Sequence, residues 1–490
     1  MIQEEQDRRN RLQAIRDAGA NPYPTESHRT KLIEEVISQF EDLESANEEI
    51  TICGRIIALR KHGGISFFNL QDASGKIQIV LHKDTVGEDV YNRFHDQTDV
   101  GDFYECHGRA FVTKNGEKSL KVTSLRILSK SLLPLPEKFH GLSDVEKRYR
   151  QRYLDLIANP EVMEKAKARA RMVTAMRNFL AHEGFLEVET PVLQAIPGGA
   201  NAQPFVTHHN TLHADLYMRI APELYLKRLL VGGFEKIYEF ARCFRNEGIS
   251  PQHNPEFTQI EAYWAYANIE QLTDHIEKLI LEAVRAVTGG QTSVEIEGKT
   301  ISFADIPRKT FREVILENTK IDLDEVTEEE TLKQIMTERG VNTTNVVGYG
   351  DLVDHLYKTA ARPKIEQPVF VTDYPAAMKP LAKRRDSNPH YSASVQLVIL
   401  GMEMCNGFNE LNDPLEQEER FKEQEELRVR GSEDSQRIDN DYIEALKHGM
   451  PPAAGYGIGI DRLAALLTGS TNLKEVILFP TLKPIEESPE

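Results

Sequence analysis

The chain has 490 residues, of which 40% are hydrophobic and 28% charged, and its formal net charge is −18. This length allows two to four domains, and the composition is that of an ordinary soluble protein. No apolar run approaches the roughly 18–20 residues of a membrane span, so we expect no membrane segment. Residues 1–5 lack the cationic start of a secretory signal. Four cysteines, far apart in the sequence, predict reduced thiols and a cytoplasmic location.

The net negative charge argues against indiscriminate binding to nucleic acid, because most of the surface would repel phosphate. A basic strip at residues 147–152, continued by Lys165, Lys167, Arg169 and Arg171, could still provide the electrostatic attraction for a specific RNA partner. The same strip is equally compatible with a solvated helix face.

The N-terminal third of the chain reads as a helical extension followed by a small β-barrel. Residues 1–50 are charged and helix-prone, and residues 51–131 carry short β-branched segments separated by glycine turns. The predicted strands are 53–59, 66–70, 76–81, 102–112 and 118–128. Asn115-Gly116 is a strong hairpin signal between the last two. The pattern fits a barrel of the oligonucleotide-binding (OB) type, although other small barrels fit equally well.

A proline-marked linker at residues 132–150 leads into a second domain, 151–490, that begins with helices. One helix is predicted to start at Pro160 and to end before Gly184. A later helix has the apolar stripe Leu272, Ile276, Leu279, Ala283 and Val287. Residues 290–365, which alternate acidic helical segments, are predicted to be an insertion.

Two segments of this domain are patterned for ligand contact. Residues 237–244 and 257–264 read as two strands joined by a polar loop, and period two places Phe257, Gln259, Glu261 and Tyr263 on one face. A sheet without a ligand would turn these groups to solvent. Residues 455–459 have glycine at alternate positions, so a flat ligand could lie against the strand before the helix that begins near Arg462.

These segments resemble motifs of the class II aminoacyl-tRNA synthetases, most closely the lysyl enzymes of the subgroup shared with aspartyl and asparaginyl enzymes. The matching strings are Phe-Arg-Asn-Glu-Gly at 244–248, His-Asn-Pro-Glu-Phe-Thr at 253–258, and Gly-Tyr-Gly-Ile-Gly-Ile-Asp-Arg at 455–462, with further strings at 196–200, 219–228 and 406–411. The resemblance covers residues 55–484. It implies an α+β protein with an N-terminal OB-fold barrel and a class II catalytic domain, an antiparallel sheet flanked by helices. It also implies a homodimer built through residues 184–191.

The resemblance also implies roles for individual residues in adenylate formation. Arg245, Glu247 and Arg462 would be catalytic, and ATP would contact these three together with His253, Phe257 and Glu403. For Arg245 and Arg462 the alternative is a structural ion pair, and for His253 it is capping of the loop. L-Lysine would be bound by Gly199, Glu223, Arg245, Glu261, Tyr263, Asn406, Phe408 and Glu410. Carboxylates around the side-chain ammonium argue against aspartate or asparagine as substrate. Glu410 could instead pair with a neighbouring arginine as part of the scaffold.

Two positions depart from the family pattern. Gln252 stands where the family usually has arginine, which puts one γ-phosphate contact in doubt. The family binds several Mg²⁺ ions per subunit, and Glu403 would be the main protein ligand. Gln396 stands at the usual position of a second glutamate, so it is expected to be a neutral and weaker ligand. Gly401 between the two would permit a bulge that turns both side chains to one site.

In the barrel, Arg60, Phe67, Gln78 and Glu117 match positions that read the tRNA anticodon, with Phe67 stacking on a base. Phe67 could instead be barrel core, although Phe68 beside it can fill the core alone. The expected activity is ATP-dependent ligation of L-lysine to tRNA(Lys). The alternatives are a lysine-adenylating relative that modifies a protein, disfavoured by the barrel, and a non-catalytic RNA-binding relative, disfavoured by the intact Arg245, Glu403 and Arg462.

Overall fold

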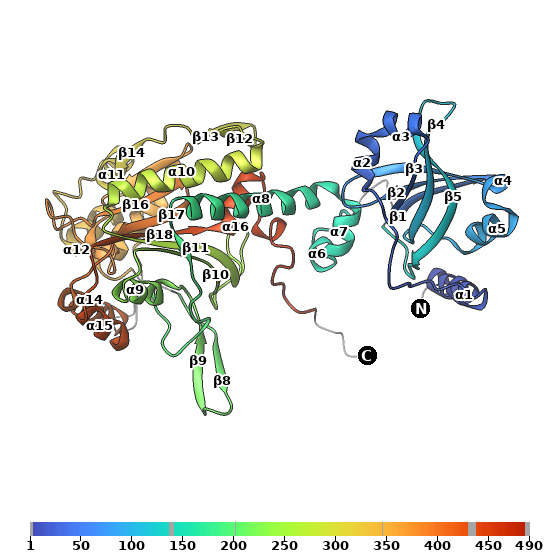
Figure 1. The fold of residues 1–490 in the computed structure, drawn as a ribbon. Helices are drawn as coiled ribbons and strands as arrows, with labels where there is room; N and C mark the ends of the chain where they lie inside the picture. The colour runs from blue at the N-terminus through green and yellow to red at the C-terminus, as the bar shows by residue number, and fades with distance from the viewer. Residues whose placement is uncertain (1–2, 137–141, 201, 345, 430–437, 486–490) are drawn as a thin grey trace. The chain divides into compact units, whose positions relative to one another are not determined.

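The computed structural model describes residues 3–136, 142–200, 202–344, 346–429 and 438–485. The chain divides into two compact units, Met1–Ser143 and Asp144–Glu490 (Figure 1). Of the predicted linker, residues 137–141 lie outside the described residues. Among the described helices, none combines the length and the apolar composition needed to cross a bilayer.

The first unit contains the predicted barrel. Its strands are β1 (Glu49–His62), β2 (Ile65–Gln71), β3 (Lys76–His82), β4 (Phe103–Val112) and β5 (Lys118–Ser129). They close in the order β1-β2-β3-β5-β4, with β3 and β5 parallel and the other pairs antiparallel. The closed five-stranded barrel expected from the strand pattern is therefore confirmed, and it agrees with the OB type that the resemblance implies.

Helices pack around this barrel. The N-terminal extension forms α1 (Gln3–Asp17), α2 (Ile33–Ser38) and α3 (Phe40–Ala46), and apolar residues of α2 and α3 join the barrel core. Two further helices, α4 (Lys83–Val86) and α5 (Glu88–Gln97), lie between β3 and β4, where no helix was predicted. Tyr91 and Phe94 of α5 are buried, and the Phe94 ring lies 5.1 Å from that of Phe68.

The second unit is built on an eight-stranded sheet of order β14-β15-β16-β17-β18-β11-β10-β6. The strands are β14 (Arg308–Thr310), β15 (Val369–Thr372), β16 (Ser394–Ile399), β17 (Met402–Asn409), β18 (Ala453–Gly459), β11 (Glu256–Ala265), β10 (Lys236–Phe244) and β6 (Leu186–Glu187). The six central strands are antiparallel, as expected, and the strand at each edge pairs in parallel.

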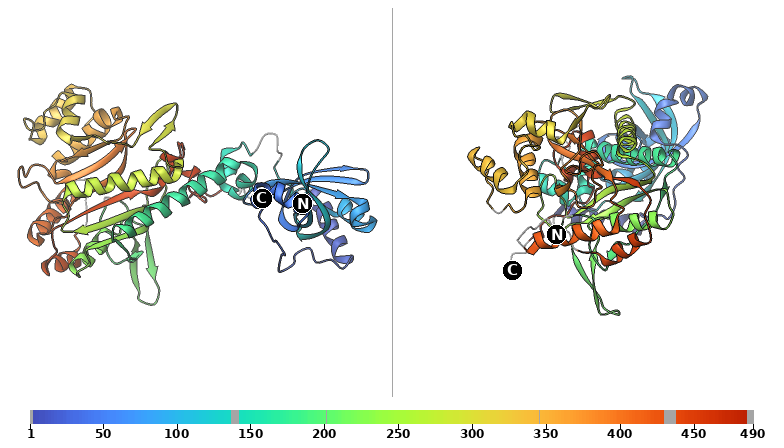
Figure 2. Two further views of the ribbon diagram at one scale, coloured as in Figure 1. Left: turned by 45° about the horizontal axis from the view of Figure 1, so that its top comes forward. Right: turned by 90° about the vertical axis from the view of Figure 1, so that its left-hand side faces the viewer.

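Two long helices, α8 (Pro160–His182) and α10 (Ile269–Thr288), lie side by side along one face of this sheet (Figures 1 and 2). The predicted stripe of α10 is buried, since Leu272, Ile276, Leu279 and Ala283 are fully covered. These side chains share one apolar core with α8, with the sheet and with α16 (Ile460–Leu467), which follows β18 directly. This apolar core covers one face of the sheet, so the polar groups lie on the other face.

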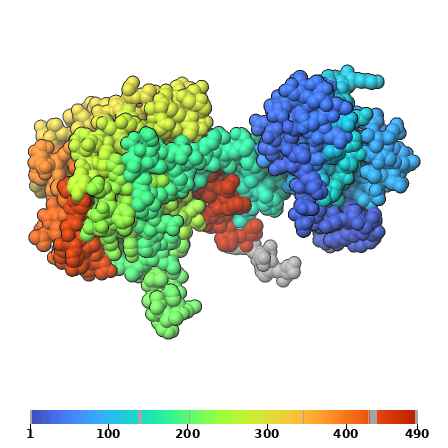
Figure 3. All heavy atoms as spheres, in the orientation of Figure 1, coloured from blue at the N-terminus to red at the C-terminus, as the bar shows by residue number. Residues whose placement is uncertain are grey.

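The remaining helices are α6 (Val145–Arg150), α7 (Arg152–Ala158), α9 (Glu223–Val231), α11 (Phe311–Thr319), α12 (Glu329–Glu338), α13 (Tyr349–Leu356), α14 (Pro414–Val429) and α15 (Asn440–Lys447). Helices α11 to α13 pack around an apolar core that they share with Val371, Tyr374 and Val398 of the β15–β16 region, and β14 of the same segment pairs with the main sheet. The hairpin of β8 (Val206–His209) and β9 (Ala214–Met218), joined by β7 (Leu193–Gln194), projects from this unit (Figure 3), and β12 (Ser293–Ile296) pairs with β13 (Lys299–Ser302).

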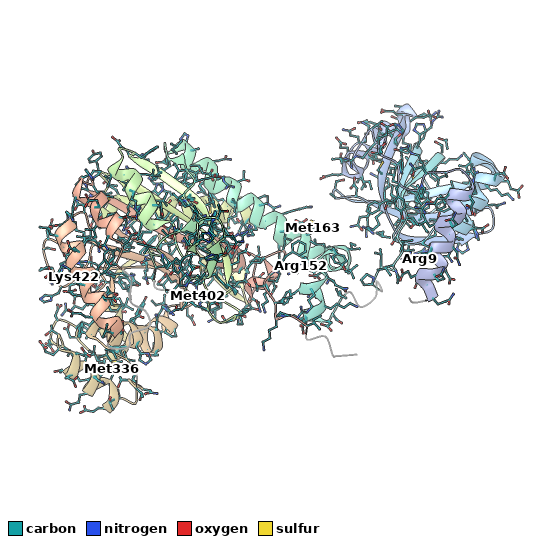
Figure 4. The ribbon with its side chains drawn as sticks, turned by 90° about the horizontal axis from the view of Figure 1, so that it is seen from below. Arg9, Arg152, Met163, Met336, Met402 and Lys422 are labelled. Carbon is teal, nitrogen blue, oxygen red and sulfur yellow. The ribbon has the colours of Figure 1, made fainter. Side chains whose placement is uncertain are left out.

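The basic strip at residues 147–152 is largely occupied by contacts within the chain. Arg152, labelled in Figure 4, is 1% exposed and donates to Asp155 and to the carbonyl oxygens of Leu478 and Lys474. Arg148 also pairs with Asp155, at 2.7 Å. The interpretation of this strip as a continuous phosphate-binding surface is therefore wrong for Arg152, which stabilises the fold.

Candidate active site

Strand β11 carries the polar face that its alternation predicts. Glu261 is the central group of that face, and it is 6% exposed. Its carboxylate accepts hydrogen bonds from Gln259 Nε2 at 2.7 Å and from Tyr263 Oη at 2.9 Å. All three side chains therefore lie on one face of the strand, opposite the apolar core.

Beside this face lies a buried cluster of charges. The Nζ of Lys227 on α9 is 2.6 Å from Glu223 Oε1, one turn earlier on the helix, and 2.6 Å from Glu410 Oε2. The Lys227 ammonium also lies 5.2 Å from the centre of the Phe408 ring. Glu410 therefore has a lysine as its partner, where the sequence suggested an arginine as the scaffold alternative.

The cluster holds more carboxyl groups than ammonium groups. Glu223 and Glu410 contact the single ammonium of Lys227, and Glu261 lies near Glu223. Burial raises the pKa of Glu410 to about 8 even though Lys227 opposes the shift. Burial, and then the charge of Glu223, raise the pKa of Glu261 well above its ordinary value. Buried carboxylates that outnumber their cations are costly, and a further ammonium would relieve that cost.

Glycines shape the surroundings of this cluster. A Cβ at Gly455 would meet Tyr263 and Glu410 within 2.6 Å, and a Cβ at Gly199 would meet Glu223 at 2.8 Å. Gly199 also has a φ of 85°, a backbone region that favours glycine. Further along β18, a Cβ at Gly457 or Gly459 would meet no atom closer than 3.6 Å. Only the first glycine of the alternation is therefore required by packing within the chain, and the other two leave room over the strand.

A group of basic side chains lies at the other end of the same strands. The Arg245 guanidinium lies over the Phe257 ring, 5.0 Å from its centre, and its Nε is buried without a hydrogen-bond partner. No hydrogen bond or ion pair involving the Arg245 side chain occurs among the described residues. A partly buried guanidinium without an anion is suited to bind one from solution.

Arg462, at the start of α16, completes this group. Its Nη2 lies 3.2 Å from His253 Nε2, while Ser250 Oγ lies 2.8 Å from the Nδ1 of the same ring. Burial, and then the charge of Arg462, lower the pKa of His253, which favours a neutral imidazole. The nearby Glu247 is exposed, and its charge opposes that shift. His253 is therefore bonded within the loop, in agreement with the capping alternative, and its contact with ATP stays a prediction.

The positions proposed for metal binding lie where β16 meets β17. Gln396 pairs with Asn406 and Val398 with Glu403, and a register shift leaves Met404 without a partner. The bulge is therefore at Met404 and turns Glu403 and Asn406 to one face. Gly401 instead forms the turn between the strands, with a φ of 70°.

The side chains of the two candidate ligands differ in the hydrogen bonds that they already make. The Glu403 carboxylate has no hydrogen bond or ion pair with any residue that the structure describes, so it fits a magnesium ion held also by phosphates. Gln396 Oε1 accepts a hydrogen bond from Tyr374 Oη at 2.6 Å, and the Lys379 ammonium donates to Asn406 Oδ1 at 2.8 Å. Because the oxygen of Gln396 is already bonded and a cation lies beside it, the residues at this position do not fit a second metal ion.

In the barrel, the four residues predicted to read the anticodon are all at least partly exposed. Arg60 pairs with Phe67 across β1 and β2, and Gln78 of β3 donates to Ser119 at 3.2 Å. Phe67 is partly exposed whereas Phe68 is 1% exposed, so Phe68 fills the core. Glu117, at the start of the hairpin arm that leads to Ser119, is exposed.

Two lysines of the site were not singled out in the sequence. Lys227 carries a detectable signal, because a spacing of i, i+4 from Glu223 would place both side chains on one face of any helix formed there, as it does on α9. Lys379 carries none, since it lies in an irregular segment between β15 and β16 and reaches Asn406 only through the tertiary fold.

Comparison with known proteins agrees with this geometry. Residues 144–483 match the family model of class II tRNA synthetases (D, K and N), and residues 50–128 match that of the OB-fold nucleic acid binding domain. The chain belongs to the class II tRNA synthetase family. A lysine–tRNA ligase of Roseiflexus castenholzii is 46% identical over 98% of this chain and 99% of its own length. Lysine–tRNA ligases of Pelotomaculum thermopropionicum and Carboxydothermus hydrogenoformans are 47% and 46% identical, over 98% and 97% of this chain and 94% and 97% of theirs.

Proposed function

We propose that this protein ligates L-lysine to tRNA(Lys) through a lysyl-adenylate, with ATP as the second substrate. The observation that carries this proposal is the contrast between the two ends of β11: buried carboxyl groups in excess beside one end, and beside the other the Arg245 guanidinium, which has no anionic partner among the described residues. Lysine and ATP present the complementary groups, an ammonium on an aliphatic stem and a chain of phosphates.

Lysine would lie with its side-chain ammonium among Glu223, Glu410 and Tyr263. Lys227 already neutralises part of the charge of the two carboxylates, so the substrate supplies the missing cation. Phe408 would cover the stem, Glu261 and the backbone at Gly199 would hold the α-amino group, and Asn406 would lie beside the bound amino acid. A substrate without the ammonium would leave buried carboxylates unpaired, and sites of this kind discriminate strongly.

The chemistry is an in-line attack of the lysine carboxylate on the α-phosphorus of ATP, which releases pyrophosphate. Catalysis of such a step consists mainly of positioning and charge stabilisation. Arg245 would hold the carboxylate and the α-phosphate together, and Arg462 would cover the adenine that rests on Phe257. His253 and Glu247 would line the triphosphate. The 3′-terminal ribose hydroxyl of tRNA then attacks the adenylate carbonyl and releases AMP.

Glu403 would hold the magnesium ion that accompanies ATP, since its carboxylate is free of partners among the described residues. When bound, the ion neutralises charge on the phosphates. One protein carboxylate together with substrate phosphates is a usual way of binding magnesium.

The barrel would bind the anticodon loop through Arg60, Phe67, Gln78 and Glu117. Single-stranded bases are recognised by stacking on exposed aromatic rings and by hydrogen bonds to their edges. The partly exposed Phe67 ring beside Arg60 would offer both contacts. Because a relative that modifies a protein would not need this surface, the barrel favours tRNA as the acceptor.

We further propose a cytoplasmic homodimer. Large apolar side chains of the segment that follows α8 are exposed in the single chain: Leu186 at 53%, Leu193 at 48% and Val206 at 58%. Association of two copies through this segment would cover them. Sedimentation of the purified protein should give the mass of a dimer, and Leu193→Glu should shift it toward the monomer.

The function is tested by lysine-dependent ATP–pyrophosphate exchange, followed by aminoacylation of purified tRNA(Lys). Exchange with lysine and charging of tRNA(Lys) are both expected. Exchange without charging of tRNA would favour a relative that modifies another acceptor, and the absence of exchange would contradict the proposal.

A further inference from the structure

The carboxylate of Asp461 joins three segments that lie far apart in the sequence. Asp461 stands in the first turn of α16, directly before Arg462, and is 2% exposed. Its Oδ2 accepts a hydrogen bond from the backbone N–H of Thr258 on β11 at 2.8 Å, and its Oδ1 accepts one from Arg169 Nη2 on α8 at 2.7 Å. Both carboxylate oxygens are therefore bonded, and α16 packs against α8 and against β11 (Figure 1).

The bond to Thr258 extends the connection between β11 and β18 past the end of β18. The last registered pair of these strands is Gln259 with Gly459, because the chain enters α16 at the next residue. The Thr258 N–H lies beyond this pair and takes the Asp461 carboxylate as its acceptor. A backbone N–H that is withdrawn from water needs such a partner, so the bond belongs to the folded sheet.

Arg169 supplies the positive charge of this group. Its side chain is 27% exposed, and its Nη2 also lies 3.3 Å from Thr258 Oγ1. Asp461 forms no other ion pair with any residue that the structure describes. The sequence suggested Arg169 as part of a basic strip for RNA, but its guanidinium is bonded within the chain. Because a buried carboxylate without its cation is costly, Arg169 holds Asp461 in place.

Thr258 and Asp461 each adjoin a residue proposed to contact adenine. Phe257 precedes Thr258 on β11, and Arg462 follows Asp461 on α16. Successive side chains alternate across a strand and differ by about 100° around a helix, so both neighbours point away from the carboxylate. The stem of Arg462 lies over Gly459, where a Cβ would be 3.7 Å from it. The Asp461 carboxylate therefore ties the backbone beside one proposed adenine contact to the backbone beside the other.

We propose that Asp461 and Arg169 are positioning residues for ATP, which hold Phe257 and Arg462 at the spacing that one adenine ring needs. Neither of the two touches the nucleotide. This inference rests on the proposed function, because it assigns the space between Phe257 and Arg462 to adenine. Bonds that only stabilised the fold would affect the use of lysine and of ATP alike, whereas positioning of the adenine contacts acts on ATP.

Asp461→Asn is the sharpest variant because it keeps the shape of the side chain. The amide has one accepting oxygen, so it can accept from the Thr258 N–H or from Arg169 but must turn its NH₂ group to the other donor. We expect the Kd for α,β-methylene ATP and the KM for ATP to rise by about tenfold, while the KM for lysine changes little. Arg169→Ala should have the same effect in the same direction.

The test combines nucleotide binding with exchange kinetics in the full-length protein. Calorimetry measures the Kd for α,β-methylene ATP, which cannot form the adenylate, and pyrophosphate exchange gives the KM values for ATP and for lysine. Arg169→Lys keeps the charge and a donor, so it should restore most of the affinity lost in Arg169→Ala. Wild-type affinity for the nucleotide in Asp461→Asn, or equal rises of the two KM values, would overturn the proposal.

Two control variants separate positioning from stability. Met176 is a fully buried core residue of the same helix, about two turns after Arg169, so Met176→Ala should lower the melting temperature and leave the KM for ATP unchanged. Arg285→Ala removes an exposed pair with Glu282, at 2.9 Å on α10, and should change neither. A rise of the KM for ATP in Met176→Ala as large as that in Asp461→Asn would overturn the proposal.

The outcomes also distinguish this inference from the proposed function. If Asp461→Asn does not fold, Arg169→Ala provides the same comparison, since Arg169 is partly exposed. Wild-type protein that binds the nucleotide but shows no lysine-dependent exchange would refute the proposed function alone, because calorimetry still tests Asp461 and Arg169.

Discussion

The two ends of the site along β11 carry ionisable groups of opposite charge. At one end, Glu223, Glu261 and Glu410 are buried around a single lysine, and burial raises the pKa of the last two. At the other, Arg245 and Arg462 lie close together, and the Arg245 side chain has no anionic partner among the described residues. At each end, partly buried ionisable groups outnumber the groups of opposite charge, so their charged forms are unfavourable until a substrate group of the opposite sign binds. The difference between the ends therefore defines both the substrates and their orientation.

The largest effect is expected at the basic end. Arg245→Ala should lower kcat/KM for lysine-dependent exchange by about a thousandfold, because the guanidinium stabilises charge that develops during attack on the α-phosphorus. Pyrophosphate exchange kinetics measure this effect. Arg242→Ala is the control, since Arg242 lies on the same strand, is exposed and approaches Glu256 only at 3.5 Å. Near wild-type exchange in Arg245→Ala would remove the residue from the reaction.

At the acidic end, Glu410→Gln should lower kcat/KM for lysine by roughly a hundredfold, while the KM for ATP changes little. The variant removes one of the two carboxyl groups that contact Lys227, and with it a carboxylate that would pair with the substrate ammonium. Steady-state exchange at varied lysine and at varied ATP separates the two effects. Glu418→Gln, an exposed carboxylate on α14, should behave as wild type. An unchanged KM for lysine would show that Glu410 only supports the scaffold.

A substitution on the barrel surface should affect aminoacylation of tRNA without affecting either end of the catalytic site. Phe67→Ala should reduce aminoacylation of tRNA(Lys) by about tenfold, as expected for the loss of one stacked base, and should leave pyrophosphate exchange intact. Phe68→Ala is the contrasting variant. It removes a core ring and should destabilise the unit by about 3–5 kcal/mol, which thermal unfolding would detect. A parallel loss of exchange and charging in Phe67→Ala would identify Phe67 as structural.

The smallest effect concerns pH. Because burial raises the pKa of Glu410 to about 8, this carboxyl group is mostly protonated at pH 7 in the free protein. A bound ammonium favours the carboxylate, so lysine binding should release up to about one proton at pH 7, and affinity should rise with pH until about 8. Calorimetry in buffers of different ionisation enthalpy measures the release. Glu410→Gln should abolish most of it, and equal release by both proteins would assign the proton to another group.

Local patterns were enough to predict much of this molecule. Alternation and the Asn115-Gly116 turn gave the barrel strands, and period two gave the polar face of Glu261 and Tyr263, because these features depend on neighbours in sequence. The contact of Lys379 with Asn406 could not be found in this way, because Lys379 lies in an irregular segment far from Asn406 in sequence. In addition, the bulge at Met404 changes which face of β17 the Asn406 side chain occupies. Helix α5 was missed for a related reason: its two buried aromatic residues pack against the barrel core, and no local pattern shows that contact.

The central claim is that the acidic end selects for an ammonium, and norleucine tests it most directly. Norleucine has the same α-amino acid group as lysine and a similar aliphatic stem, but it ends in a methyl group. ATP–pyrophosphate exchange with norleucine should have a kcat/KM lower than that with lysine by about 10⁴-fold, because the carboxylates of Glu223 and Glu410 would remain buried without the second cation. Comparable exchange with the two amino acids would contradict the account.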